Sequence, residues 1–518
     1  MAVKTYQDLV AVGEREDKRI KFVKDAIVSH KSSPFYKTAE LAHLYDMQMN
    51  PTIVNYQKLL YKVSGEAVPD NYSANFKLRS NLFHRLITEL IQYELGNGTK
   101  WMKPSRPVSE ATARKYPENE VFEEDVWNPN AEMYVPQWFV AGTDRKVGED
   151  FDARLTDLFT YALSEGVSFG FWNYDHLEVF SVREFVPFYD EENGALMAGI
   201  RFWQIDPNKP LRATLYEVDG YTDYIWKKGA LQGMVLEQKR KYKTVITASD
   251  ADKEDDYIYK GENYDGFPII PAWASRNKLS ALEGMRENLD AYDLIKSQLC
   301  NTVSEASLIF WTLNGASGMD EIDLAKFQDQ MNRLKMALVE DGGASAEAHS
   351  MDVPYAGTEA TLERLRNDIY EDFMCLDTKT IASGATTATQ IQASYEPQNE
   401  RADELENGIL DFIQRMLHIA GIQDKPTFVR SVVVNKAEEI QILVQTAQYL
   451  PEEYLTKRIL TVFGDIDAYD EVMRLKMGEE MEMAGLGNDD DDDEKEKSID
   501  TETEEQAQEA PEGTSEAE

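Results

Sequence analysis

The spacing of apolar residues changes along the chain and divides it into helical and extended regions. Residues 1–60 have helical spacing, interrupted by proline-containing loops at Ser32–Pro34 and Met49–Pro51. A stronger amphipathic pattern covers residues 75–95, and Gly96-Asn97-Gly98 is predicted to end that helix. Its apolar positions are Leu78, Leu82, Leu86, Ile87, Leu90, Ile91 and Leu95. A shorter helix is predicted from Leu155 to Glu165, before Gly166.

The middle of the chain has the period-two pattern of strands. Two apolar runs, Phe180–Tyr189 and Leu196–Ile205, flank a polar loop that ends in Asn193-Gly194, which is a strong hairpin signal. Glycine-containing turns at Asp219-Gly220 and Lys228-Gly229 mark further strands. These are predicted at Ala213–Val218, Tyr221–Trp226 and Leu231–Leu236. The pattern therefore predicts an antiparallel meander inside a mostly helical chain.

Long helices return after residue 276. The first carries a narrow apolar stripe at Leu282, Met285, Leu289, Tyr292, Ile295, Leu299, Val303 and Ala306. A second, with Thr358 as its predicted cap, carries Leu362, Leu365, Ile369, Phe373 and Leu376. Such stripes lie close to a heptad seam and are typical of helices that pack against other helices. The fold class is mainly α with an inserted antiparallel β meander, an α+β arrangement.

The remaining helices are less regular. Small and polar residues from Ala382 to Thr387 break the pattern, and a third long helix follows as far as Gly421. Pro397 is predicted to kink that helix. A last helical unit begins with the capping-box spacing of Asn435 and Glu438, continues from Pro451 to Phe463, and restarts after Asp467.

Charge changes the picture more than composition does. The 518 residues contain 54 Lys and Arg against 94 Asp and Glu, a formal net charge of −40. Residues 487–518 alone hold 15 acidic residues and two lysines, a net charge of −13, which leaves −27 on the rest. This tail has one isoleucine and no aromatic residue, and such a composition predicts disorder. The sign of the charge excludes a protein that grips nucleic acid by neutralising its phosphates.

Motifs for chemistry are missing from the sequence. No G-x-x-x-x-G-K-[ST] loop occurs, and the six histidines and two cysteines, Cys300 and Cys375, lack the spacing of zinc ligands. Two cysteines cannot form a disulfide framework, which favours a reducing compartment and ordinary thiols. Among 94 acidic residues, pairs at any spacing arise by chance. We therefore expect no cofactor, no metal site and no enzymatic activity.

Several stretches together resemble the portal proteins of tailed bacteriophages of the siphovirus type. They are Asn75–Gly98, Ala162–Gly170 followed by Glu184–Gln204, Gly266–Pro271 followed by Asn277–Glu283 and Leu289–Asp293, and Pro451–Glu471. In that family a proline-rich entry leads into a helix that lines a tunnel. The resemblance covers about residues 30–480, and the acidic tail is expected to lie outside it.

The resemblance implies a subunit divided into wing, stem, clip and crown. Residues 1–275 would be the wing, 276–306 and 354–378 the two stem helices, and 307–353 the clip between them. Residues 379–390 would be a tunnel loop, and 391–421 a long kinked wing helix. The crown would span 422–484, before the disordered acidic tail at 485–518.

The resemblance also implies function and partners. Such proteins form closed rings, usually of twelve subunits, at one capsid vertex of the virion after assembly in the host cytoplasm. The ring conducts double-stranded DNA during packaging and ejection, without reading its sequence. The clip would dock the large subunit of an ATP-driven terminase first and a head-completion adaptor, the head–tail connector, later. The wing would contact the major capsid protein and the scaffolding protein. No apolar run in the sequence approaches 18 residues, so no membrane span is expected.

A channel that guides DNA must not bind it tightly, because neutralised phosphates would stall its movement. We therefore expect carboxylates to line the tunnel, where they repel phosphate over about 8–10 Å. The candidates are Glu283, Glu287, Asp290 and Asp293 on the first stem helix and Glu363, Asp368, Glu371 and Asp372 on the second. Solvated outer faces are the alternative. Candidate DNA contacts in the tunnel loop are Lys379, Thr380, Ser383, Thr386, Thr387 and Thr389, against the alternative of an ordinary interhelical loop.

Two other functions stay open at the level of sequence. The chain could be a minor capsid or tail protein with coiled-coil-like helices and no channel. It could also be a metal-dependent nuclease that uses clustered carboxylates. A ring with a central opening would favour the portal interpretation over both.

Overall fold

The structure is a computed structural model and forms two compact units, residues 1–433 and 434–518, which are described separately. It describes residues 4–61, 65–70, 73–105, 121–128, 133–142, 146–228, 233–248, 257–306, 310–314, 345–349, 355–377, 379, 393–431, 440, 443–446, 449, 451–463, 469 and 472–476.

The N-terminal helices begin at side-chain caps. Thr5 caps α1 (Tyr6–Val12) through a capping box with Asp8, and α2 (Glu16–Lys31) follows. Ser33 and Asn50 cap α3 (Pro34–Asp46) and α4 (Pro51–Val54), each of which has proline at its first position. These caps lie at the two proline-containing loops predicted from the sequence.

The predicted meander is confirmed as a five-stranded antiparallel sheet in the order β12-β11-β10-β9-β8. Its strands are β8 (Phe185–Tyr189), β9 (Leu196–Trp203), β10 (Leu211–Glu217), β11 (Gly220–Trp226) and β12 (Met234–Arg240). The single run expected from Phe180 to Tyr189 is wrong, because it divides into two strands of different sheets. Its first residues belong to β7 (His176–Ser181), in the three-stranded sheet β15-β6-β7.

The two faces of the meander meet different layers. One face packs on α1 and α2 through residues such as Phe22, Val186 and Leu215. The other packs on β7, β6 (Ser168–Asn173) and β15 (Ile269–Ala272) through alternate residues, among them Phe185 and Tyr216. Alternation with period two puts neighbouring residues of one strand on opposite faces.

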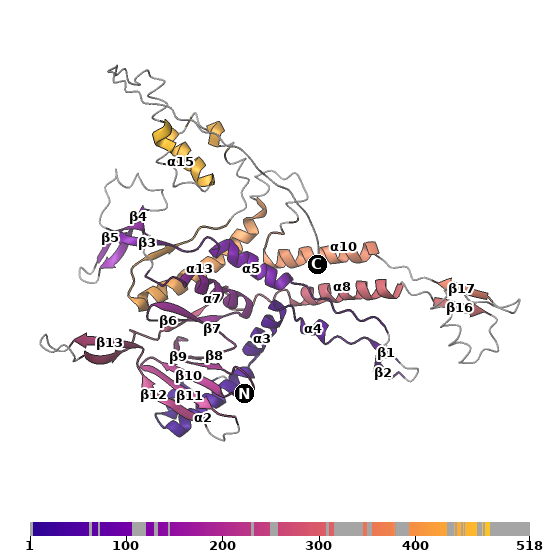
Figure 1. Cartoon of the computed structure of the whole chain (residues 1–518), viewed down its shortest axis with the longest axis horizontal. Coiled ribbons are helices and arrows are strands. Elements are labelled where there is room, and N and C mark those ends of the chain that lie inside the picture. Colours follow the sequence, from indigo (N-terminus) through magenta and orange to yellow (C-terminus); the bar gives the residue numbers. More distant parts are fainter. Residues whose placement is uncertain are drawn as a thin grey trace, which may run out of the picture. The chain divides into compact units, whose positions relative to one another are not determined.

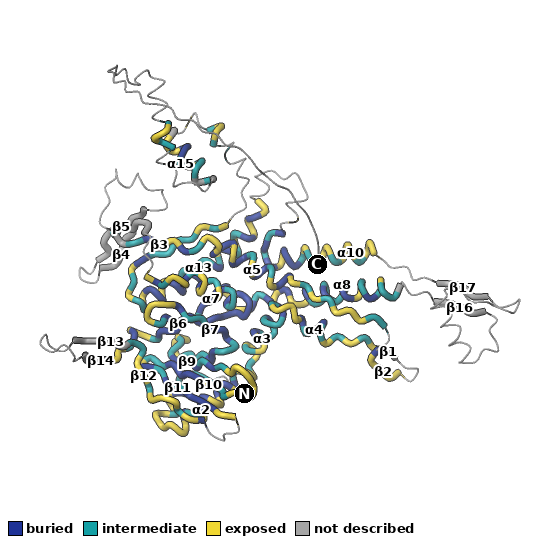
Figure 2. The backbone as a smooth tube through the Cα atoms, in the orientation of Figure 1, coloured by how far each residue is buried: buried dark blue, intermediate teal, exposed yellow. Residues whose placement is uncertain are grey.

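The largest hydrophobic core of the first unit lies around three helices (Figure 2). These are α5 (Leu82–Leu95), α7 (Phe151–Glu165) and α13 (Glu396–Ala420). The ends predicted at Gly96 and Gly166 are confirmed, and Gly166 has the left-handed conformation that favours glycine. Gly408 lets α13 approach β15, since an added Cβ would lie 2.2 Å from the carbonyl oxygen of Trp273.

Several strands were not predicted, so the fold is more mixed than the sequence indicated. A four-stranded sheet has the order β18-β3-β5-β4, and three two-stranded ribbons pair β1 with β2, β13 with β14 and β16 with β17. Their bounds are β1 (Leu59–Tyr61), β2 (Ala67–Pro69), β3 (Lys100–Ser105), β4 (Val121–Asn128), β5 (Met133–Gly142), β13 (Lys243–Ala248), β14 (Tyr257–Glu262), β16 (Phe310–Asn314), β17 (Ser345–His349) and β18 (Lys425–Thr427). Helix and antiparallel sheet both contribute substantially to the chain.

The two predicted stem helices exist, with different starting points. α8 spans Arg286–Ala306 instead of beginning near Asn277, because residues 277–285 form turns that still bury Leu282 and Met285. α10 spans Tyr355–Phe373, so Thr358 lies inside it and is not its cap. The predicted kink at Pro397 is also wrong. This proline stands in the first turn of α13, where a missing N–H breaks no helical hydrogen bond.

In the second unit, α15 covers Glu452–Phe463 and matches the helix predicted from Pro451 to Phe463. Residues 472–476 are also helical, in agreement with the predicted restart. The capping box predicted at Asn435 and Glu438 and the acidic tail at residues 485–518 lie outside the described residues. Within the described chain, no helix is both long and apolar enough to cross a bilayer.

Candidate functional site

Helices α8 and α10 lie side by side and are the candidate site (Figure 1). Leu289 on α8 and Ile369 and Phe373 on α10 are buried in the main core of the first unit. Asn288 Nδ2 donates a 2.7 Å hydrogen bond to Asp372 Oδ2, which joins the two helices at their exposed faces. In the chain, β16 follows α8 and β17 precedes α10, and these two strands pair with each other.

One face of α8 buries polar side chains instead of apolar ones. Asp293, Ser297 and Asn301 recur every fourth residue and receive backbone N–H groups of an extended segment, residues 76–80. Ser80 N donates to Asp293 Oδ1 at 2.8 Å, Leu78 N to Ser297 Oγ at 2.9 Å, and Phe76 N to Asn301 Oδ1 at 2.6 Å. We call these three hydrogen bonds the α8 ladder.

The α8 ladder depends on matched repeats. Four residues of helix rise about 6 Å, and two residues of extended chain advance about 6.6 Å. Alternate N–H groups of the segment therefore meet successive turns of α8. This pairing also explains why residues 75–81 are not helical, although the sequence predicted a helix from 75: their backbone donors bind α8.

Asp290 lies next to the α8 ladder and is held by the N-terminal helices. Its carboxylate accepts hydrogen bonds from Tyr45 Oη at 2.5 Å, Asn50 Nδ2 at 3.0 Å and Thr52 Oγ1 at 3.0 Å. Asn50 also donates to Asp293 Oδ2 at 3.1 Å. Burial raises the pKa of Asp293, although hydrogen bonds from Ser80 and Asn50 oppose the rise.

The eight candidate carboxylates therefore fall into three groups. Asp293 is 2% exposed and leaves the set of candidate tunnel-lining residues, because its carboxylate is enclosed by its own chain. Asp290, Glu283 and Asp372 accept hydrogen bonds from neighbouring side chains, with Thr38 Oγ1 as the donor to Glu283 at 3.2 Å. The other four lie at the surface of the helix pair: Glu287, Glu363 and Glu371 are exposed, and Asp368 is partly exposed, 4.0 Å from Arg364 Nε.

The end of α10 is fixed by an ion pair that the sequence did not reveal. Arg366 Nε and Nη2 donate to the two oxygens of Asp377 at 2.8 and 3.1 Å, and Lys379 N donates to Asp377 Oδ1 at 3.1 Å. Burial alone would raise the pKa of Asp377, but these hydrogen bonds hold it below its usual value. The chain that enters the predicted tunnel loop thus starts from a fixed point.

The chain that leaves the predicted loop is tied to the same place. Leu376 N donates to Gln398 Oε1 at 3.1 Å, and Tyr93 Oη donates to Asn399 Oδ1 at 2.5 Å. The rings of Tyr93 and Tyr395 are stacked, with centroids 5.8 Å apart. Both ends of the loop region therefore meet at the C-terminal end of α5. Cys375 is buried there, and burial raises the pKa of its thiol to about 12, as for an unreactive structural cysteine.

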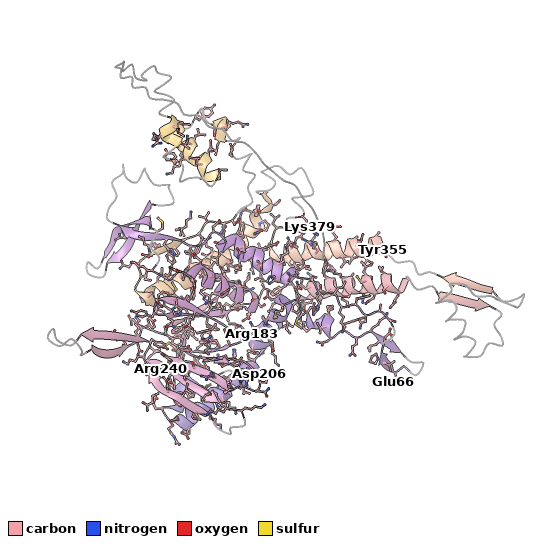
Figure 3. All side chains as sticks on the ribbon, viewed as in Figure 1. Glu66, Arg183, Asp206, Arg240, Tyr355 and Lys379 are labelled. Carbon is pink, nitrogen blue, oxygen red and sulfur yellow. The ribbon has the colours of Figure 1, made fainter. Side chains whose placement is uncertain are left out.

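Of the candidate DNA contacts, Lys379 alone lies within the described residues, and it is exposed. Figure 3 labels Lys379 and also Tyr355, the first residue of α10. Thr380, Ser383, Thr386, Thr387 and Thr389 lie outside the described residues. Among the described residues, no three His, Cys, Asp or Glu side chains gather in a group that could hold a metal ion.

The family of the chain follows from its match to a family model. Residues 146–509 match the family described as phage portal protein, SPP1 Gp6-like. The chain belongs to this family of portal proteins, a structural class, and family membership assigns it a portal or connector role in a phage virion. The match starts later than the resemblance at about residue 30 suggested, and it runs into the acidic tail, contrary to expectation.

Structural neighbours are particles of gene transfer agents. The neck of an empty particle, with C6 symmetry, matches at 14% identity and a TM-score of 0.35, covering 61% of this chain and 79% of that chain. The neck of a native particle, with C12 symmetry, gives 12% and 0.35, covering 61% and 82%. The virion of a native particle gives 12% and 0.34, covering 61% and 81%. These scores are too low to define the fold in detail, and no curated protein matches.

Proposed function

We propose that the chain forms a closed ring through which double-stranded DNA enters and leaves the capsid. The observation that carries the proposal is the presence of four carboxylates at the surface of α8 and α10, in a chain of the portal family. Carboxylates next to DNA repel its phosphates over about 8–10 Å at physiological salt, so the wall guides the duplex without holding it. Glu287, Glu363, Asp368 and Glu371 are the residues proposed to face the channel.

A closed ring requires each subunit to present two different surfaces that fit under rotation. α8 offers half-buried apolar residues for such a contact, including Tyr292, Ile295 and Leu299, and Val303 is exposed. We propose about twelve subunits, with residues 1–275 as wing, 276–306 and 354–378 as stem, 307–353 as clip, 379–390 as tunnel loop, 391–421 as wing helix and 422–484 as crown. The C-terminal boundary in the structure, at 433/434, lies inside the proposed crown.

The proposed partners follow from this arrangement. The clip would bind the terminase large subunit during packaging and a head-completion adaptor afterwards, and the wing would bind the major capsid protein and the scaffolding protein. Assembly would take place in the host cytoplasm, before the ring becomes part of the virion vertex.

Charge reversal tests the channel. Changing Glu287, Glu363 and Glu371 together to lysine should slow DNA packaging at least about tenfold, because three cations per subunit would bind phosphate along the channel. The defect should weaken at higher salt, where phosphate contacts lose affinity. The matched control changes three exposed acids of the wing, Glu16, Asp17 and Asp25, to lysine, which adds the same charge away from α8 and α10. Equal packaging by both triple variants would contradict the channel assignment.

Lys379 provides a separate test of the tunnel loop. Lys379→Glu should change the rate of packaging, since the side chain is exposed directly after the Arg366–Asp377 pair. Unchanged packaging, with rings intact in micrographs, would remove Lys379 from the set of DNA contacts without affecting the assignment of the carboxylates.

A further inference from the structure

A polar cleft of about 580 Å³ lies in the first unit, away from α8 and α10. One wall is a single face of α3, with Tyr36, Glu40 and His43. The other wall consists of Tyr161 from α7, the turn between β7 and β8, and the adjoining ends of β9 and β10. This volume is within the range of about 300–1,000 Å³ typical of ligand sites. The cleft lies within residues 1–275, the proposed wing, and the proposed channel assigns no role to it.

Two cations line the cleft, Arg183 and, at the end of α2, Lys31; Arg183 is labelled in Figure 3. Its Nε donates a 2.7 Å hydrogen bond to Glu165 Oε1, and Ser181 Oγ donates to Glu165 Oε2 at 2.6 Å. The Glu165 side chain is 1% exposed, so it is a fixed support. Neither terminal guanidinium nitrogen of Arg183 has a hydrogen-bond partner within the described part of the chain. The outer edge of the guanidinium is therefore oriented and open, and this edge fits a carboxylate through two parallel hydrogen bonds.

Further donors surround Arg183. Tyr36, His43 and Tyr161 also line the cleft. Each lies close enough to Arg183 that the positive charge of the guanidinium acts to lower the pKa of the tyrosine or histidine. The two phenol hydroxyls have no hydrogen-bond partners among the described residues. Burial, followed by the charge of Arg183, lowers the pKa of His43, so a neutral imidazole donates from one nitrogen at pH 7. Arg183, the two phenols and the imidazole thus give the cleft four possible hydrogen-bond donors, from α3, α7 and the turn between β7 and β8.

The remaining lining distinguishes between possible anions. Glu40 and Glu184 also line the cleft and balance the charges of Arg183 and Lys31, so the cleft lacks the cationic excess with which proteins hold the phosphates of DNA. Phe202, which is 4% exposed, and the half-buried Trp203 each add an aromatic side chain to the lining. Ile205 follows the lining residue Gln204 and is 89% exposed, and Phe35 precedes Tyr36 and is 37% exposed. Arginine and aromatic side chains are enriched where proteins bind other proteins, which favours a protein segment as the occupant.

We propose that this cleft binds a short extended segment of another protein of the phage particle, with one acidic side chain paired to Arg183. Trp203 would contact the neighbouring residues of the segment, and Glu40 and Glu184 would accept its backbone N–H groups or a flanking cation. The portal role enters only in saying where the partner is to be found, because the contacts of the cleft are independent of the channel.

An array of overlapping peptides tests the proposal. The array covers every protein encoded by the same phage genome and is probed with the purified full-length chain. Each peptide that binds is remade with its acidic residues changed to amides, and fluorescence anisotropy gives its affinity. We expect at least one peptide whose affinity falls at least about tenfold on amidation, which is the size of a charge-assisted bidentate contact.

Variants of the chain locate the contact. Arg183→Lys retains a cation for Glu165 but lacks the two-pronged outer edge, so it should weaken that peptide at least about tenfold. Combining it with the amidated peptide should add little, because both changes remove one contact. Tyr36→Phe with Tyr161→Phe removes only hydroxyls and should weaken binding several-fold. Arg415→Gln, on the exposed surface of α13, is the matched control and should bind as the wild type does.

Three results would overturn the proposal. The first is that no peptide of the array binds in a way that depends on its acidic residues. The second is that a bound peptide has the same affinity for Arg183→Lys and for the double tyrosine variant as for the wild type. The third is that inorganic phosphate or duplex DNA inhibits binding while amidation weakens no peptide. Micrographs of Arg183→Lys should show the same assembly as the wild type. Failure of the cleft and failure of the channel are therefore distinguishable.

Discussion

Helices α8 and α10 look alike in sequence and differ in how their own chain covers them. On α8, Asp293, Ser297 and Asn301 are buried under residues 76–80, and the helix is fixed along three turns. α10 buries mainly its C-terminal turns, around Ile369 and Phe373, and its N-terminal half is exposed or half-buried. The difference indicates that α8 is held rigidly by its own subunit, while α10 has exposed surface that can contact other molecules.

The largest effect should come from breaking the α8 ladder. Asp293→Ala would leave Ser80 N without its acceptor and Asn50 Nδ2 with only one of its two acceptors, Asp290. The loss of both hydrogen bonds to the buried carboxylate should cost about 3 kcal/mol of unfolding free energy and lower the Tm in calorimetry. Asp368→Ala on partly exposed α10 is the control and should change the Tm little. If both variants lost equal stability, the two helices would not differ as described.

The ion pair at the end of α10 should come second. Arg366→Ala leaves Asp377 buried without its guanidinium and should cost about 2–3 kcal/mol. Arg364→Ala is a close control, since the Arg364 side chain is 84% exposed against 16% for Arg366. Because Asp377 has a lowered pKa, its pair stabilises the fold above the unfolded-state pKa of aspartate, and this stabilisation is lost as pH falls through the folded-state pKa. The Tm of Arg366→Ala should accordingly fall less in acid than that of the wild type.

A third measurement uses a buried carboxylate outside the helix pair. Glu94 is enclosed beside Arg430, and burial raises its pKa to about 7; Arg430 opposes the rise and Glu406 adds to it. The folded chain therefore keeps a proton that the unfolded chain releases, and stability should fall as pH rises from about 4.5 to 7. Glu94→Gln should flatten this dependence by about 2 kcal/mol, visible as a smaller change of Tm across that range. An identical pH profile for the variant would show that Glu94 does not carry the effect.

The smallest effect should come from the exposed acids of α10. Glu363→Gln and Glu371→Gln should each change the unfolding free energy by less than about 0.5 kcal/mol, because neither side chain is buried. The same pair should alter the salt dependence of packaging. A stability loss above about 1 kcal/mol would mean that these acids hold the subunit together, and the contrast with α8 would fail.

The sequence predicted local features well where residue chemistry dictates them. Asn193-Gly194 and Asp219-Gly220 mark turns of the meander, and Gly166 ends α7, because few residues other than glycine adopt such turns. The prediction that the first stem helix begins before residue 286 was wrong, because Leu282 and Met285 have helical spacing but lie in turns, from which their side chains are still buried. The kink predicted at Pro397 was wrong because the spacing of apolar residues does not show where α13 begins, and the proline lies in its first turn.

The candidate site was less predictable than the fold. The spacing of Asp293, Ser297 and Asn301 is visible in the sequence, and a polar row beside an apolar stripe could have been noticed. Its partner lies more than 200 residues away, however, and backbone N–H groups have no sequence signature. Arg366 and Asp377 are likewise indistinguishable from many charged pairs until burial separates them from Arg364.

An electron-microscopy reconstruction of the assembled full-length chain would show whether α8 and α10 surround a channel. We expect a closed ring with a central opening, α8 and α10 around it, and Glu287, Glu363 and Glu371 directed at the axis. A chain that forms no ring would contradict this expectation, as would a ring whose outer surface carries those three carboxylates.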